Sequence, residues 1–258
     1  MNAIVQLFLK TIDQFSEDSP LKKSFWNSQI LSHVQSNESL RRLLSENMPE
    51  LRNGQQDSFD FFSALGHFSE SDKEWLLNPL TMFTKTTTTC MRNTNHQSSA
   101  FHNLPDFYMS VDIPRDNSSI QEVIENEFTT GQQINDWKCM RCDSYGGIKV
   151  KTVQNGLEPN YILIKLRRAE LDANGRGIKN IKDVIPPLGF TVKTDDDDVF
   201  AYSLCGVLTH LGQSLTSGHY ISEVKRGIKW WKCDDSRITE TSFENLSKQG
   251  YGFLFEKM

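Results

Sequence analysis

His219 and the aspartate pair Asp234 and Asp235 are residue types that can move protons, and fifteen positions separate the histidine from the first aspartate. Between them, valine, isoleucine and two tryptophans flank a Lys-Arg-Gly turn, a pattern that predicts a two-stranded antiparallel hairpin. With Arg226 and Gly227 as the two loop residues, His219 faces Asp234 directly, with Cβ atoms about 5 Å apart.

In this register, the Asp234 carboxylate accepts the Nδ1 proton of His219, fixes the tautomer of the ring and leaves Nε2 as a general base. The same residues also fit an edge-strand histidine beside a solvated acidic turn. Gly218 favours the functional interpretation, because a missing side chain lets another backbone, such as that of a substrate, approach closely. These strands supply no nucleophile, since Cys233 points to the opposite strand face from Asp234.

A second group of residues has the spacing of metal ligands. Cys139 and Cys142 form a C-x-x-C pair followed by the turn-forming Asp-Ser-Tyr-Gly-Gly, as in half of a zinc ribbon. Cys90 begins another polar turn, where Asn93 stands at the second cysteine position and His96 is the available fourth ligand. Two alternatives follow: a closed structural zinc site, or a decayed site that leaves three partly buried thiols without metal.

The bulk composition excludes several classes of function. The 258 residues include 24% charged and 37% apolar residues, as in ordinary soluble proteins. The net charge of −5, with no basic stripe, argues against a nucleic-acid partner and suits a basic one. The sequence shows no basic leader with a cleavage site and no apolar run near ~20 residues, so we expect neither a signal peptide nor a membrane span. The odd cysteine count indicates a reducing compartment.

The surrounding pattern predicts an α+β fold in three regions. Residues 1–80 have helical periodicity, and one of the expected helices begins after Asn53-Gly54. Residues 81–155 are threonine-rich and strand-like, with a helix near 118–128. Residues 156–258 contain further strands, a solvated loop at 195–198 and a core cysteine, Cys205. The predicted strands of this last region are NYILIKLRR, VFAYSLCGVLTHL, HYISEV, IKWWKCD and YGFLFEK.

Taken together, these motifs resemble the ubiquitin-specific protease family, the papain-like cysteine proteases that remove ubiquitin. LTSGHYISEV followed by KWWKCDDS resembles the family's histidine box, and NYILIKLRRAEL resembles its Tyr-Leu-hydrophobic-Leu-Lys-Arg-Phe strand. QQDSFDF resembles its Gln-Gln-Asp box, with Asp60 where glutamate is usual. The resemblance implies a helical thumb at residues 1–80, β-rich fingers at 81–155 with a possible zinc ribbon, and a β-sheet palm at 156–258.

The resemblance also assigns catalytic roles. It makes His219 the general base, Asp234 its orienting carboxylate and Asp235 a polar support. The opening MNAIVQL resembles the residues that follow the nucleophile in the family's cysteine box, where the cysteine stands two residues before the methionine, after Gly-Asn-Thr. We therefore expect a truncated ubiquitin-specific protease domain without its nucleophile, inactive alone. The alternative is a ubiquitin-binding interaction module that does not cut.

The remaining expectations concern partners, location and cofactors. Ubiquitin or ubiquitinated proteins are the expected partners, with no nucleic acid and no membrane, in the cytoplasm or nucleus. No catalytic cofactor is expected, and one structural zinc ion is expected if the closed site, and not the decayed one, is present. Asp57 and Asp60 lie on one helix face and either grip the arginines of the ubiquitin tail or cap the helix. The residues expected to contact the ubiquitin tail are Gln56, Asp57, Asp60, Gly218 and Tyr220.

Overall fold

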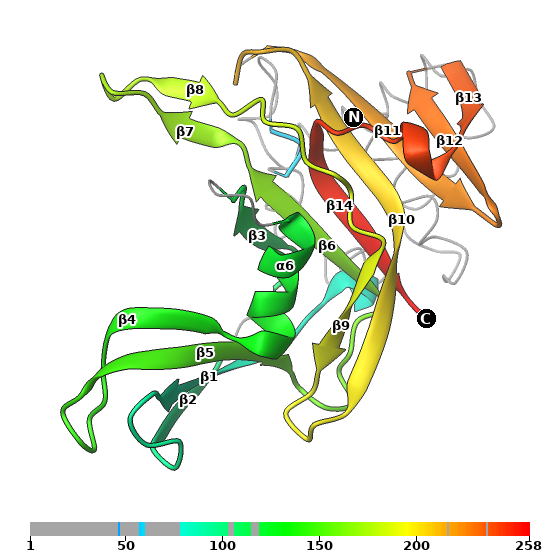
Figure 1. Cartoon of the computed structure of the whole chain (residues 1–258). Helices are drawn as coiled ribbons and strands as arrows, with labels where there is room; N and C mark the ends of the chain where they lie inside the picture. The colour runs from blue at the N-terminus through cyan, green and yellow to red at the C-terminus, as the bar shows by residue number, and fades with distance from the viewer. Residues whose placement is uncertain are drawn as a thin grey trace.

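Figure 1 shows the computed structural model, which describes residues 46, 57–59, 78–102, 106–114, 119–215, 217–235 and 237–258. The helices predicted within residues 1–80 lie outside the described residues, except that Glu46 is helical and that residues 57–59, near the expected start of one helix, form a turn. Within the described ranges, no helix is long and apolar enough to cross a membrane.

A sheet of eight strands dominates the structure. Its strands follow the order β13-β12-β11-β10-β14-β6-β3, and β9 pairs with the first part of β10. All neighbouring pairs are antiparallel except β3 and β6. The bounds are β3 Met109–Asp112, β6 Tyr161–Arg167, β9 Gly189–Lys193, β10 Val199–Leu211, β11 His219–Arg226, β12 Lys229–Asp234, β13 Arg237–Thr241 and β14 Gly250–Lys257.

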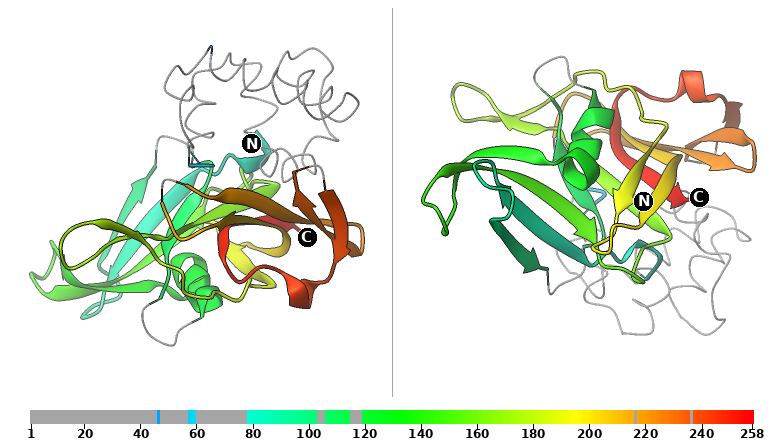
Figure 2. Two further views of the ribbon diagram at one scale, coloured as in Figure 1. Left: turned by 90° about the horizontal axis from the view of Figure 1, so that it is seen from above. Right: turned by 60° about the horizontal axis from the view of Figure 1, so that its bottom comes forward.

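Two smaller sheets extend away from the large one in Figures 1 and 2. The four-stranded sheet has the order β2-β1-β5-β4, and the two-stranded sheet is the hairpin of β7 and β8. The bounds are β1 Thr84–Cys90, β2 Gln97–Phe101, β4 Gln132–Lys138, β5 Tyr145–Val153, β7 Ala169–Leu171 and β8 Gly177–Lys179, with 3-10 turns η3 Asn78–Leu80 and η5 Phe243–Asn245.

The helix predicted near 118–128 is present as α6, Ile120–Glu125, which continues into the π-helical turn η4, Asn126–Thr130. A capping box starts it: the Glu122 amide donates to Ser119 Oγ at 3.1 Å, and the Ser119 amide donates to the Glu122 carboxylate at 2.8 Å. Ile124 and Phe128 are fully buried. The helix therefore attaches to the molecule through its apolar face.

The core of the large sheet is built around Phe190 of β9. Its ring stacks on Phe128 and Tyr202 at centroid distances of 5.7 and 5.9 Å and meets Phe255 edge-on at 4.7 Å. Burying such a ring stabilises the fold by roughly 1.5–3 kcal/mol. One aromatic side chain thus joins η4 to three strands of the sheet.

The strands predicted in the carboxyl-terminal half are all present, as β6, β10, β11, β12 and β14. The acidic run 195–198 forms a turn that is exposed from 196 to 198, as predicted. Cys205 is a core residue as expected, with 1% of its surface exposed, and it sits at a register shift between β10 and β14.

A buried arginine closes the end of β6. Arg168 is 1% exposed and donates to main-chain carbonyls of four residues: Gly250 at 2.8 Å, Asn180 at 3.0 Å, Lys182 at 2.9 Å and Lys248 at 3.4 Å. Burial lowers the pKa of the guanidinium to about 10, so it remains charged at neutral pH. The carbonyls take over the solvation that water would provide.

Arg168→Met should lower the free energy of unfolding by at least about 3 kcal/mol, because it leaves several buried carbonyls without a donor. The neighbouring Arg167→Met is the matched control: Arg167 is exposed, and its ion pair with Asp112 at 2.6 Å contributes at most about 1 kcal/mol. Urea denaturation of both variants measures the difference. Equal losses would show that the buried guanidinium contributes no more than a surface charge.

Candidate active site

The hairpin that carries His219 forms, but in a different register from the predicted one. Ser222 pairs with Cys233 and Arg226 with Lys229, so the loop residues are Gly227 and Ile228 instead of Arg226 and Gly227. Gly227 has a φ of 60° and takes the first loop position, as in a type II′ turn. The predicted register was wrong by two residues because the glycine, not the arginine, begins the turn.

His219 and Asp234 nevertheless meet. In the observed register Asp234 is diagonal to His219 on the same face, and Nε2 of the ring lies 2.6 Å from Oδ1 of the carboxylate. The prediction that Nδ1 faces Asp234 was wrong, and within the described part of the chain Nδ1 has no hydrogen-bond partner. Asp235 Oδ2 is 4.0 Å from the same Nε2, and both ring and Asp234 are about two-fifths exposed, so a substrate can reach them.

Gly218 is held in a space that no other residue fits. A Cβ atom there would stand 2.2 Å from the Leu211 carbonyl oxygen and 2.3 Å from Nε2 of His210. The predicted close backbone approach is therefore present, and the chain that approaches is β10 of the same molecule. Contact of Gly218 with a substrate remains a prediction.

His210 supports the strand that carries His219. It pairs with Tyr220 in the β10–β11 ladder, and the two rings stack with centroids 4.6 Å apart. Burial, together with the positive charge of Lys179, lowers the pKa of His210. The Lys179 ammonium also donates to the carbonyls of His210 and Gly212 at 2.6 Å each. A neutral ring thus packs beneath the loop that leads to His219.

None of the chain's five cysteines, all of which the structure describes, faces His219. Cys205 lies six positions before Leu211, the partner of His219, and is therefore about 20 Å away along β10. Cys233 is buried on the face of β12 opposite to Asp234. The other three belong to the group described below. The site thus has a histidine in contact with a carboxylate, and no cysteine of the chain lies beside this pair.

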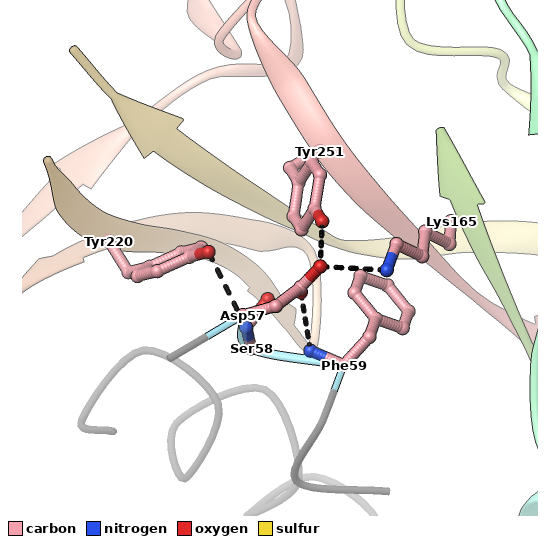
Figure 3. A network of polar contacts seen from close by, with 6 residues as sticks. All are labelled: Asp57, Ser58, Phe59, Lys165, Tyr220 and Tyr251. Atoms are coloured by element: carbon pink, nitrogen blue, oxygen red, sulfur yellow. Dashed lines mark hydrogen bonds and ion pairs between the residues drawn. The ribbon is translucent and has the colours of Figure 1, made fainter. Parts of the chain in front are cut away.

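Asp57 is held by three donors from different parts of the chain (Figure 3). Its Oδ1 accepts the Phe59 amide at 2.8 Å, and its Oδ2 accepts the Lys165 ammonium at 2.8 Å and the Tyr251 hydroxyl. Burial alone would raise the pKa of this carboxyl, but the hydrogen bonds from Lys165, Tyr251 and Phe59 outweigh it and lower the pKa. The carboxylate is thus engaged within the molecule.

The residues after Asp57 pack on the same strands. Phe59 is 1% exposed and lies edge-on to Tyr251 at 5.5 Å, with the Lys165 ammonium 4.9 Å from its ring centre. The Ser58 amide donates to the Tyr220 hydroxyl at 3.4 Å. Segment 57–59 is therefore attached to β6, β14 and β11, next to the strand end that bears His219. Gln56 and Asp60 lie outside the described residues.

Lys165 and Tyr251 were not identified from the sequence as site residues. Lys165 interrupts the apolar run Tyr-Ile-Leu-Ile-Lys-Leu of β6, and a charged side chain in such a strand requires a partner. That partner, Asp57, is 108 positions away, a separation that local patterns do not bridge.

The four predicted metal ligands come together at the end of the four-stranded sheet, with their ligand atoms within 4.8 Å of one another. Cys90 Sγ lies 3.7 Å from Cys142 Sγ, and Cys139 Sγ lies 3.7 Å from Nδ1 of His96. Bond lengths of about 2.3 Å to sulfur and 2.0–2.1 Å to nitrogen give tetrahedral edges of about 3.6–3.8 Å, which these distances match. The donor set fits a metal ion.

Neighbouring side chains support two of these ligands. Asn93, which stands where a second cysteine was expected, places its amide nitrogen 3.3 Å from Nε2 of His96 and so contacts the ring nitrogen that faces away from the group. The Ser144 hydroxyl lies 3.0 Å from Cys142 Sγ, and this hydrogen bond is the main reason that the pKa of Cys142 falls to about 7.

The large sheet and the four-stranded sheet agree with the papain-like fold that the resemblance to ubiquitin-specific proteases implied. The family model "Ubiquitin carboxyl-terminal hydrolase" matches residues 1–255, and the chain belongs to this family.

Solved structures agree on the fold. The chain matches one in the SAGA Ubp8/Sgf11/Sus1/Sgf73 DUB module bound to ubiquitin aldehyde, with a TM-score of 0.71, 18% identity and coverage of 99% of this chain and 63% of that one. A second match is a substituted form of Ubp8 in the same module bound to monoubiquitin, also with a TM-score of 0.71 and 18% identity, covering 99% of this chain and 62% of that one.

Curated relatives match over part of their length. Ubiquitin carboxyl-terminal hydrolase 16 of Arabidopsis thaliana is 29% identical over 158 residues, which are 57% of this chain and 15% of that protein. Ubiquitin carboxyl-terminal hydrolase 11 of Schizosaccharomyces pombe is 29% identical over 138 residues, 52% of this chain and 38% of that protein. The chain thus spans well under half the length of these relatives.

Asp57→Asn should lower the free energy of unfolding at pH 7 by about 1.5–3 kcal/mol, the usual worth of hydrogen bonds to a charged group. The pKa of Asp57 is lowered in the folded state, so its stabilisation is present above the ordinary pKa of 3.8 and is lost as the pH falls through the folded value. Denaturation curves from pH 7 to pH 2.5 should show the variant and wild type converging.

The control is Asp143→Asn. Asp143 also forms a lysine ion pair, with Lys138 at 2.8 Å, but its side chain is 81% exposed, so the substitution should change stability by less than about 1 kcal/mol. A pH-independent effect of Asp57→Asn would show that its ionised carboxylate is not the stabilising group.

Proposed function

We propose that this domain acts in deubiquitination: it binds the carboxyl-terminal tail of ubiquitin and supplies the general base for thiol-dependent cleavage of the bond that follows the tail. The observation that carries the proposal is the 2.6 Å contact of His219 Nε2 with Asp234, which leaves Nδ1 of the ring available. Membership of the ubiquitin carboxyl-terminal hydrolase family supports it, as does the fold shared with chains bound to ubiquitin aldehyde and monoubiquitin.

The chemistry assigned to His219 is proton transfer at Nδ1. The ring accepts the proton of a cysteine thiol, the thiolate attacks the carbonyl carbon of the terminal residue of ubiquitin, and Asp234 stabilises the imidazolium. Collapse of the intermediate breaks the C–N bond while Nδ1 returns the proton to the leaving amine. Water, deprotonated by the same nitrogen, then hydrolyses the thioester and regenerates the thiol.

No cysteine of the chain faces His219, so we propose that the thiol in this scheme is supplied by a cysteine other than these five. A fluorogenic amide of ubiquitin should therefore show no turnover with the chain alone. A form extended at its start by Gly-Asn-Thr-Cys and one further residue should gain turnover.

In the extended form, His219→Ala should reduce kcat/KM by at least about 100-fold, since base and nucleophile act as a unit. His102→Ala, at an exposed histidine next to β2, is the matched control and should leave the rate unchanged. If every extended form bound ubiquitin without turnover, the proposal would be wrong and the chain would be a non-catalytic ubiquitin-binding module.

For recognition of the tail, we propose that Gly218 and Tyr220, which flank His219, contact it together with Gln56, Asp57 and Asp60. Asp57 already accepts from Lys165, so an arginine of the tail can use this carboxylate only by displacing the lysine. Asp57 also anchors Phe59 and Tyr251, and this positioning role needs no exchange.

Calorimetry with ubiquitin distinguishes exchange from positioning. If Asp57 grips a tail arginine, Lys165→Met frees the carboxylate and should tighten binding, whereas Asp57→Asn should weaken it by ~2 kcal/mol. If Asp57 only positions its neighbours, both substitutions should lower thermal stability and neither should tighten binding. Arg167→Met, two positions after Lys165, is the control, because it also removes a positive charge from this strand.

We also propose that Cys90, His96, Cys139 and Cys142 hold one structural zinc ion, whose role is to cross-link the two turns that carry them. A closed set of four protein ligands leaves no position for a substrate, which suits a structural ion. All five cysteines are free thiols, which suits the reducing cytoplasm or nucleus.

Purified protein prepared without chelator should contain about one zinc per chain, and Cys142→Ser should lose most of it. Cys205→Ser, at a buried cysteine remote from the group, is the control and should retain the metal. Elemental analysis measures both. A metal-free wild-type protein with an intact four-stranded sheet would show that the site has decayed.

A further inference from the structure

The two turns that carry the metal-ligand group repeat the same three residues. Cys90-Met91-Arg92 ends β1, and Cys139-Met140-Arg141 follows β4. In each turn the cysteine is buried, whereas the methionine and arginine after it are exposed. The repeated tripeptide therefore places two Met-Arg pairs on the outer surface at the end of the four-stranded sheet.

This end of the sheet has an apolar surface that the fold leaves uncovered. Met140 is 89% exposed, Tyr145 68% and Met91 51%. The Met91 amide donates to the Gly146 carbonyl at 3.2 Å, and its sulfur lies 3.1 Å from the position that a Cβ of Gly146 would take, so Met91 packs against Gly146, the residue after Tyr145. We call Met91, Arg92, Met140, Arg141 and Tyr145 the fingertip surface.

The fingertip surface is positively charged. Neither Arg92 nor Arg141 forms an ion pair with another described residue. The acidic residue of these turns, Asp143, is paired with Lys138 at 2.8 Å. Because the whole chain carries a net charge of −5, this local excess of positive charge is not a consequence of a basic composition.

Exposed methionine and tyrosine together with arginines that have no ion-pair partner among the described residues is the composition of a protein-binding surface, since aromatic residues, Met and Arg are enriched at interfaces. Methionine adapts its shape to different apolar side chains, and arginine forms bidentate bonds with carboxylates. We infer that the fingertip surface docks an acidic segment of a partner protein, which inserts an apolar side chain between the two methionines and pairs its carboxylates with the two arginines.

The inference lies beyond the proposed function, because the surface belongs to the four-stranded sheet and includes no residue of the His–Asp site. In Figure 1 the turns between β1 and β2 and between β4 and β5 lie at the opposite end of this sheet from the large one. A partner bound there leaves the surroundings of His219 open. Docking and cleavage can therefore be tested separately.

The test is a selection of random 12-residue peptides displayed on phage against the purified protein, with depletion on the variant Arg92→Glu/Arg141→Glu. Peptides that survive are synthesised with a fluorophore and measured by anisotropy. We expect them to carry net negative charge with at least one large apolar residue, and we expect their affinity to fall at higher salt.

The affinity should fall at least tenfold for Arg92→Glu/Arg141→Glu and for Met91→Ser/Met140→Ser, and stay within twofold for Arg176→Glu, an exposed arginine on the β7–β8 turn. The milder Arg92→Gln/Arg141→Gln should also weaken binding, and unchanged melting temperature and metal content show that the variants are folded.

Three results would overturn the inference. The first is a selection that yields no peptide able to distinguish wild type from the charge-reversed variant. The second is enrichment of neutral or basic peptides. The third is a dimer, measured by light scattering, that the charge reversal dissociates, because a second copy of the chain would then be the occupant of the fingertip surface.

Discussion

The pairing of β10 along both of its edges is the constraint on which the rest of the structure depends. On one edge, residues 199–203 pair with β9 and residues 206–211 pair with β11; on the other edge, β14 pairs from Tyr202 to Thr209. Backbone groups buried in a sheet must find partners, so the 13-residue strand fixes three neighbours at once. The register of β11 places His219 opposite Leu211, and that of β14 places Tyr251 next to Gly250, the partner of Thr209.

The contact between His219 and Asp234 formed although its predicted register was wrong. Moving one strand by two residues against its partner keeps every side chain on its original face, whereas a slip of one residue would have put the two groups on opposite faces. An aspartate and a histidine on the same face of the hairpin therefore remain within reach of each other, whether they are directly opposed or diagonal. The ring nitrogen that meets the carboxylate depends on this offset, and strand periodicity alone did not determine it.

The parts of the fold that follow from the sequence are those set by neighbouring residues. The helix near 118–128 and the strands of the carboxyl-terminal half depend on spacings of a few positions, and the structure shows them where they were expected. The metal-ligand group was also predictable, since two short Cys-containing turns on adjacent hairpins bring their own ligands together. Asn93 stands at the spacing of a second cysteine, and His96 of the same turn joins the three cysteines in its place.

The interactions that could not be predicted are those of buried cations, because their partners come from distant segments. Lys165 finds Asp57 across 108 positions, and Arg168, three residues later, finds carbonyls at Gly250 and Lys248 about 80 positions away. A cation in an apolar strand indicates that a partner exists but not where it lies. Since both cations belong to the end of β6, this short stretch connects segment 57–59 to the carboxyl-terminal strand. Its similarity to the family's Lys-Arg strand therefore reflects the packing of these segments, whereas the proton transfer that we propose involves residues of β11 and β12.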